Sequence, residues 1–89
     1  MSEADNTWRV DLDGQHYEIE VNHYTMTGRI DVLVDGSVVG RKRLLFTQRE
    51  IPLRLGQHAA QVTVDFANLG FSARSKLHVD GRYVEPLRR

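Results

Sequence analysis

The sequence predicts an all-β fold, an antiparallel β-sandwich of about eight short strands joined by tight hairpins. Apolar and polar residues alternate through most of the 89-residue chain, a period typical of strands that bury one face. Three Asp-Gly pairs, beginning at Asp13, Asp35 and Asp80, interrupt the alternation, and such pairs favour two-residue hairpin turns. Because no segment shows the 3.6-residue period of an amphipathic helix, we expect strands throughout.

The first hairpin turns at Asp13. A two-residue loop there sets Trp8 opposite Ile19 on one face of the ribbon. The same loop sets Arg9 opposite Glu18 on the other face. One register therefore satisfies an apolar pair and an opposite-charge pair together, which is the consistency expected of a genuine hairpin.

The second hairpin requires a β-bulge in its return strand. In a simple register Val39 faces Val32. Arg41 and Arg43 then point toward the core as well, which is unfavourable for charged side chains. One extra residue reverses this parity and turns both arginines outward. Glycine is common at such irregularities, so we expect the bulge at Gly40.

The third and fourth hairpins follow the same rules. Ile51 opens an alternating segment that contains Pro52, which has no N–H for a ladder. We therefore expect this strand either at a sheet edge or with Pro52 facing away from a partner strand. Gly56 suits the first position of a type II′ turn, which sets Ile51 opposite Val62. The last Asp-Gly turn closes a hairpin of the same kind near the C-terminus.

Residues that share the inward parity form the predicted core. They are Trp8, Val10, Tyr17, Ile19, Val21, Ile30, Val32, Phe46, Val62, Val64, Phe66, Phe71 and Leu77. We expect one domain over residues 7–85, with tails at 1–6 and 86–89 that lack periodicity.

Charge and composition exclude several classes of partner. Twelve basic residues balance twelve acidic ones, so the formal net charge is zero. That balance argues against binding to nucleic acid or to an anionic membrane surface. No apolar run approaches the ~18 residues of a membrane span, and the N-terminus lacks a signal-peptide pattern. The absence of cysteine excludes disulfides and cysteine-ligated metals, and we expect a cytoplasmic protein.

The sequence shows no pattern for catalysis, metal binding or cofactor binding. The four histidines, at positions 16, 23, 58 and 78, have neither helical metal spacing nor a same-face spacing of two. Of these, His16 and His58 lie at hairpin tips. The aspartates at the turns are explained by turn chemistry, so no catalytic acid pair is needed to account for them. The serines lack a nucleophile-elbow context, and we expect no enzyme, no metal and no cofactor.

Among the sequence patterns, the strongest candidate for a functional role is the basic run Arg41-Lys42-Arg43. Arginine outnumbers lysine ten to two, and a planar guanidinium suits bidentate recognition of carboxylate or phosphate. The simpler interpretation is a solvated strand whose charges guard a sheet edge against unwanted pairing. If the run is a contact surface for a protein partner, its predicted residues are Tyr24, Arg29, Arg41, Lys42 and Arg43.

A series of short motifs runs in order through the chain. They are Trp8-Arg9-Val10-Asp11-Leu12, Gly14-x-His16-x-Glu18-Ile19-Glu20, His23-x-x-x-Thr27-Gly28-Arg29, Val32-x-Val34-Asp35-Gly36, Arg41-Lys42-x-x-Leu45-Phe46, Val62-Thr63-Val64-Asp65, Gly70-Phe71 and Leu77-His78-Val79-Asp80-Gly81. In this order and spacing, from Trp8 to Val84, the chain resembles the Fas apoptotic inhibitory molecule (FAIM) family.

The resemblance implies an antiparallel β-sandwich without enzymatic activity. Animal members of the family are soluble cytosolic proteins associated with protection from death-receptor apoptosis and with countering protein aggregation. They resemble two tandem sandwich domains, whereas this chain has the length of one, and Leu44 stands where the family typically has tryptophan. The arginine-rich, lysine-poor composition is typical of a bacterial member.

Three functions are compatible with these observations. The first is a non-catalytic module that binds a protein through a sheet face, or by strand addition to an edge near Ile51 to Leu55. The second is a small-ligand or carbohydrate-binding sandwich, which needs a pocket or an exposed aromatic platform; we expect Trp8 in the core instead. The third is a purely structural or oligomerising domain, and an unpaired edge leaves a homodimer open.

Overall fold

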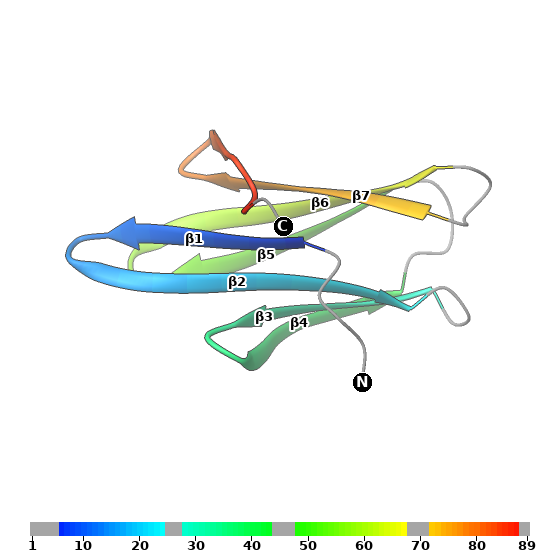
Figure 1. Ribbon diagram of the computed structural model, residues 1–89, viewed down its shortest axis with the longest axis horizontal. Coiled ribbons are helices and arrows are strands. Elements are labelled where there is room, and N and C mark those ends of the chain that lie inside the picture. Colours follow the sequence, from blue (N-terminus) through cyan, green and yellow to red (C-terminus); the bar gives the residue numbers. More distant parts are fainter. Residues whose placement is uncertain (1–5, 25–27, 44–47, 68–71, 88–89) are drawn as a thin grey trace.

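The computed structural model describes residues 6–24, 28–43, 48–67 and 72–87. Eight strands run through them: β1 (Asn6–Leu12), β2 (Gln15–Tyr24), β3 (Arg29–Val34), β4 (Ser37–Arg43), β5 (Gln48–Leu55), β6 (His58–Ala67), β7 (Ser72–Val79) and β8 (Arg82–Val84). They form two antiparallel sheets, with the order β1-β2-β3-β4 in the first and β5-β6-β7-β8 in the second. The sheets are the two layers of a sandwich (Figure 1), so the predicted all-β fold is confirmed. No helix in the described ranges is long and apolar enough to cross a membrane.

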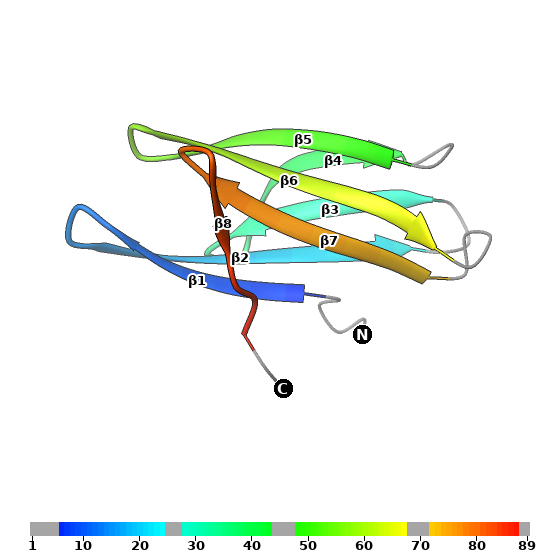
Figure 2. The same cartoon turned by 90° about the horizontal axis from the view of Figure 1, so that it is seen from above.

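A tight turn joins the two strands of each of the four hairpins, and all four turns lie at the same end of the sandwich (Figure 2). Both residues of an Asp-Gly pair have positive φ, as a type I′ turn requires: φ is 54° at Asp13 and 79° at Gly14. The pairs that begin at Asp35 and Asp80 repeat this geometry. Gly56 has a φ of 63°, as the first position of the predicted type II′ turn requires.

The predicted registers are confirmed in the hairpins of both sheets. Trp8 pairs with Ile19, and Ile51 pairs with Val62. The strand that contains Pro52, β5, lies at an edge of the second sheet, as its missing donor predicted. Turn chemistry and face parity were therefore sufficient to place these strands.

The core lies between the sheets and consists of inward-facing residues from both. Its buried hydrophobic residues are Trp8, Val10, Ile19, Val21, Ile30, Val32, Ile51, Leu53, Leu55, Ala60, Val62, Val64, Leu77 and Val79. Of the predicted core, Tyr17 is only partly buried and packs against this cluster. The side chains of Phe46, Phe66 and Phe71 lie outside the described part of the chain. The core prediction omitted the buried residues of β5, although their alternation identified the strand.

A β-bulge interrupts the pairing of β3 and β4. The register shifts between Val32 and Leu33, so Val39 is the extra residue. It lies one position before the bulge predicted at Gly40. The change of parity occurs as predicted, and the side chain of Arg41 is exposed.

Gly40 lies where the first sheet approaches β5. A Cβ atom built on Gly40 would lie 2.9 Å from Cγ2 of Ile51, well inside the normal separation of non-bonded carbons. Ile51 is 1% exposed and is held by the core, so it has little room to move away. Glycine is therefore needed at this position for close packing of the sheets.

Hydrogen bonds attach both ends of the described chain to the sandwich. Nδ2 of Asn6 donates to Oγ of Ser75 at 3.0 Å. The N–H of Leu87 donates to the carbonyl oxygen of Thr7 at 2.8 Å. Asn6 and Leu87, which the sequence analysis assigned to the tails, therefore make contacts with the folded domain.

Candidate functional site

The residues predicted as a contact surface meet at one end of the first sheet, opposite the four tight turns (Figure 2). Tyr24 at the end of β2 pairs with Arg29 at the start of β3, and Arg29 pairs with Arg43 at the end of β4. Arg41 and Lys42 precede Arg43 on the same strand, and both side chains are exposed. The side chain of Arg43 lies outside the described part of the chain. We call the remaining four residues, Tyr24, Arg29, Arg41 and Lys42, the cationic surface.

A buried carboxylate holds two arginines of the cationic surface. The side chain of Asp31 is 5% exposed, whereas that of Arg29 is 42% exposed and that of Arg41 is 56% exposed. Nε and Nη2 of Arg41 donate to the two oxygens of Asp31 at 2.8 and 3.3 Å, a bidentate pair. Nε of Arg29 lies 3.4 Å from Oδ1 of the same carboxylate. Asp31 thus orients both guanidinium groups while leaving them accessible to solvent.

An aromatic ring and a local charge excess complete the cationic surface. Cζ of Arg29 lies 4.2 Å from the centroid of the Tyr24 ring, within the range of a cation–π contact. The hydrogen bond to Asp31, together with the charge of that carboxylate, raises the pKa of Arg41 and keeps its guanidinium protonated. Arg29 and Arg41 flank one carboxylate, and Lys42, which pairs with Ile30 and so alternates to the other face of β4, adds a third exposed cation at this end of the sheet. This end is therefore positively charged although the whole chain is neutral.

At the other end of the sandwich, a histidine joins three hairpins. Nδ1 of His58 lies 2.6 Å from Oδ2 of Asp80, and Nε2 lies 2.8 Å from Oδ2 of Asp13. His58 opens β6, while Asp13 and Asp80 belong to the β1–β2 and β7–β8 turns. The imidazole therefore connects a turn of the first sheet with two hairpins of the second. We call these three residues the histidine clamp.

The sequence interpretation of the histidine clamp was incomplete. It placed His58 at a hairpin tip and assigned the aspartates to turn chemistry alone. The φ values of 54° at Asp13 and 51° at Asp80 agree with that turn role, but both carboxylates also bind the imidazole. The partners lie 45 and 22 residues from His58 along the chain, and no local pattern marks such a pairing.

We expect the histidine clamp to make the stability of the domain depend on pH. Hydrogen bonds to Asp80 and to Asp13 raise the pKa of His58 above its ordinary value of 6.5. Only a doubly protonated ring can donate to both carboxylates. The stabilising effect is therefore fully present below about pH 6.5 and is lost as the pH rises through the raised pKa of the folded state.

Urea midpoints of the wild type and of His58→Gln, from about pH 5.5 to about pH 9, measure this effect. The difference between the urea midpoints of the two proteins should be largest at the lowest pH and should decrease as the pH rises. His16→Gln is the control, because the ring of His16 is 80% exposed and exposed ion pairs contribute little. A difference for His58→Gln that stays constant over the range would contradict the expectation.

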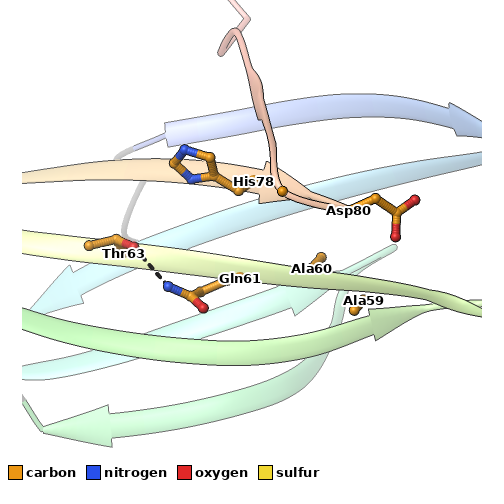
Figure 3. Close-up of a pocket in the computed structure, with 7 residues that line it drawn as sticks. Ala59, Ala60, Gln61, Thr63, His78 and Asp80 are labelled. Carbon is orange, nitrogen blue, oxygen red and sulfur yellow. Dashed lines mark hydrogen bonds between the residues drawn. The ribbon is translucent and has the colours of Figure 1, made fainter.

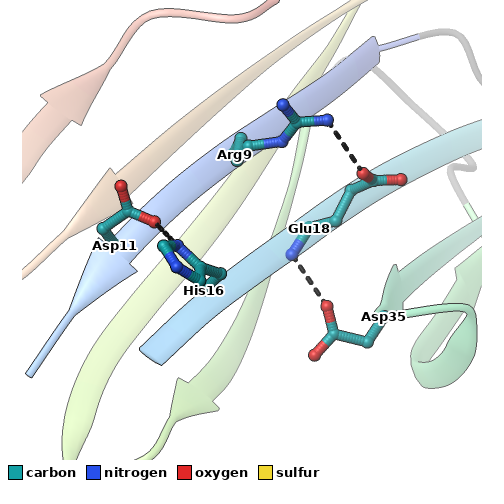
Figure 4. Close-up of polar contacts among 5 residues, drawn as sticks. All are labelled: Arg9, Asp11, His16, Glu18 and Asp35. Atoms are coloured by element: carbon teal, nitrogen blue, oxygen red, sulfur yellow. Dashed lines mark hydrogen bonds and ion pairs between the residues drawn. The ribbon is translucent and has the colours of Figure 1, made fainter. Parts of the chain in front are cut away.

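Other polar contacts of the first sheet lie in solvent (Figure 4). Arg9 forms an ion pair of 3.5 Å with Glu18, and His16 forms a hydrogen bond with Asp11. Oδ1 of Asp35 accepts the backbone N–H of Glu18 at 2.9 Å, which attaches the second turn to β2 (Figure 4). We assign these contacts to the local pairing of strands and turns, where exposed charge pairs contribute little to stability.

A shallow depression of about 480 Å³ lies on the outer face of the second sheet (Figure 3). Its lining includes the polar side chains of Gln61, Thr63, His78 and Asp80. Nε2 of Gln61 donates to Oγ1 of Thr63 at 3.5 Å. Trp8 is fully buried, as expected, and is therefore no exposed platform for a ligand.

Neither cluster has the arrangement of a metal centre. Across the described residues, no group of three or more His, Cys, Asp or Glu side chains could hold a metal ion. In the histidine clamp the two ring nitrogens face different carboxylates, so the three side chains do not converge on one point. The chemistry that the arrangement offers is recognition of anions at one end and a proton-dependent attachment of turns at the other.

The family model described as Fas apoptotic inhibitory molecule (FAIM1) matches residues 4–88 of the chain. No curated protein matches the chain. The match takes in all eight strands of both sheets, together with the cationic surface and the histidine clamp. Because it covers nearly the whole chain rather than one motif, the chain belongs to the Fas apoptotic inhibitory molecule (FAIM1) family.

Proposed function

We propose that the domain is a non-catalytic protein-binding module and that the cationic surface contacts its partner. One observation carries the proposal: buried Asp31 holds the guanidinium groups of Arg29 and Arg41, whose side chains remain 42% and 56% exposed. Groups that are already held in place lose little conformational freedom on binding. Arginine and tyrosine are also among the residue types that most often dominate the energy of protein interfaces.

The charge of the surface favours an acidic partner. The chain as a whole is neutral, so the positive charge near Arg41 and Lys42 is local. Opposite charge on a partner would raise the association rate and would fix the orientation of the complex. We also propose a cytoplasmic location, which the absence of cysteine supports.

Fluorescence anisotropy with labelled, reduced and carboxymethylated α-lactalbumin, an unfolded acidic chain, tests the cationic surface. The wild-type domain should bind it. Lys42→Glu should weaken binding by about fivefold, because reversal of one exposed charge changes the interaction by about 1 kcal/mol. Lys76→Glu is the matched control, since Lys76 is exposed on β7 in the second sheet. Absence of binding, or equal weakening by both variants, would exclude this surface.

Small-ligand binding is the second candidate, and the depression on the second sheet favours it. An amide from Gln61, a hydroxyl from Thr63 and an imidazole from His78 lie within it. Such convergent polar groups orient sugars and other polyols in binding sites. Amide shift changes confined to these residues on addition of monosaccharides would support this candidate, and unchanged shifts would dismiss it.

A further inference from the structure

Strand β4 presents an open edge of the first sheet. Its backbone pairs with β3 on one side, and on the other side its described residues form no backbone hydrogen bond with another element. The exposed side chains of β4 are Ser37, Val38, Val39, Arg41 and Lys42. This side of β4 therefore has no strand partner among the described residues, although Gly40 itself approaches β5.

The other three edges of the sandwich are less suited to receive a further strand. On β1, the carbonyl oxygen of Thr7 is already occupied by the N–H of Leu87, so the C-terminal segment covers part of that edge. β5 contains Pro52, which lacks a donor. β8 is only three residues long, Arg82–Val84. Among the described strands, β4 is the edge best able to receive a further strand, on either side of the bulge at Val39.

The side chains of β4 indicate which residues an added strand should carry. Val38 and Val39, near the turn, are 48% and 50% exposed and present an apolar surface to solvent. Arg41 and Lys42 follow them and add two positive charges. A segment lying along β4 would be most stable with apolar residues beside the valines and carboxylates beside the cations.

A second copy of this chain fits the same edge poorly. Antiparallel pairing of two β4 strands would bring Arg41 and Lys42 of both copies into one short ladder, where like charges repel. The bulge at Val39 interrupts any ladder on this edge, but in self-pairing it would occur in both strands. These features oppose self-association, whereas an acidic segment would turn the same charges into attraction.

We infer that β4 binds an extended acidic segment of another protein, which adds to the first sheet as a fifth strand. The inference rests on the proposed protein-binding function and specifies the form of the partner. Main-chain hydrogen bonds to β4 would supply affinity, and Arg41 and Lys42 would supply the preference for carboxylates. The docking edge is then β4, in place of the edge near Ile51 to Leu55 that the sequence suggested.

A fluorescein-labelled peptide of about ten residues, with valine and glutamate in alternation, tests strand addition by anisotropy. It should bind the wild-type domain, and a valine–lysine peptide should not. Backbone N-methylation at every second residue separates strand addition from charge attraction, because a strand donates to one neighbour from alternate residues only. Methylation of the set facing β4 should abolish binding, and methylation of the other set should leave the affinity within about twofold.

Variants of the domain locate the bound peptide. Lys42→Glu should weaken binding of the acidic peptide by about fivefold, and the variant should bind the valine–lysine peptide. Lys76→Glu, on the other sheet, should behave like the wild type. Amide hydrogen exchange of β4 should slow when the peptide binds, while that of β7 should not change.

The outcomes separate this inference from the proposed function. Peptide binding that neither methylation pattern weakens would overturn strand addition and leave the cationic surface as a side-chain binding site. Binding of carboxymethylated α-lactalbumin without binding of the peptide would likewise overturn the inference alone. Failure of both probes would overturn both proposals. A wild-type dimer in which the amides of β4 are protected from exchange without peptide would show that copies of the chain meet at β4, and would also overturn the inference.

Discussion

Replacement of Trp8 with alanine is expected to lower the free energy of unfolding by about 3–5 kcal/mol. Trp8 is fully buried and has the largest side chain of the core, so its truncation leaves a cavity that the neighbours fill only in part. Nε1 of Trp8 also donates to the carbonyl oxygen of Val84 at 3.1 Å, which joins the two sheets. The whole domain is stable by roughly 4–13 kcal/mol, so the variant loses a large share.

Urea unfolding followed by far-ultraviolet circular dichroism measures this loss, because the variant has no tryptophan left to report by fluorescence. Trp8→Phe is the control. It keeps most of the ring volume but removes the donor to Val84, and it should cost about 1–2 kcal/mol. Equal midpoints for the wild type and Trp8→Ala would contradict the central place of Trp8 in the core.

Replacement of Gly40 with valine is expected to destabilise the domain by about 1–3 kcal/mol. The added Cβ would lie 2.9 Å from Cγ2 of Ile51, and the two further methyl groups need room of their own. Ile51 is buried between the sheets, so relief requires the sheets to separate locally. The strain outweighs the gain in strand propensity that valine brings over glycine.

A double-mutant cycle identifies the cause of this cost. In an Ile51→Ala background the clashing methyl group is absent, so Gly40→Val should cost much less than it does beside isoleucine. Denaturant midpoints of the four proteins give the coupling free energy. An identical cost in both backgrounds would show that the close approach of Gly40 to Ile51 is not responsible.

The hairpins could be predicted because their signals are local. An Asp-Gly pair favours positive φ at both positions, and its place in an alternating segment sets the register on either side. The bulge in β4 could also be predicted, since Arg41 must leave the core. Its position was wrong by one residue, because parity requires an extra residue but does not select between Val39 and Gly40.

The two functional clusters could be predicted only in part. The sequence identified the arginines of the cationic surface, but Asp31 occupies an outward position and has the pattern of a solvated residue. Its burial comes from the arginines that cover it, a consequence of strand pairing. The histidine clamp was missed altogether, because turn chemistry already accounted for Asp13 and Asp80 and left nothing to suggest His58 as their partner.

The order of strands in the two sheets has a consequence for folding kinetics. Every strand pairs only with its neighbours along the chain, so each sheet is a meander. Meander pairing keeps the contacts within each sheet between strands that are adjacent in sequence, and local contacts are associated with faster folding than distant ones. Residues 6–43 and 48–84 can each form a ribbon from local contacts before the two meet. Unlike a Greek-key sandwich, in which distant strands must find each other to complete either sheet, this chain completes each sheet from strands adjacent in sequence, and distant segments such as Trp8 and Val84 meet where the two sheets pack.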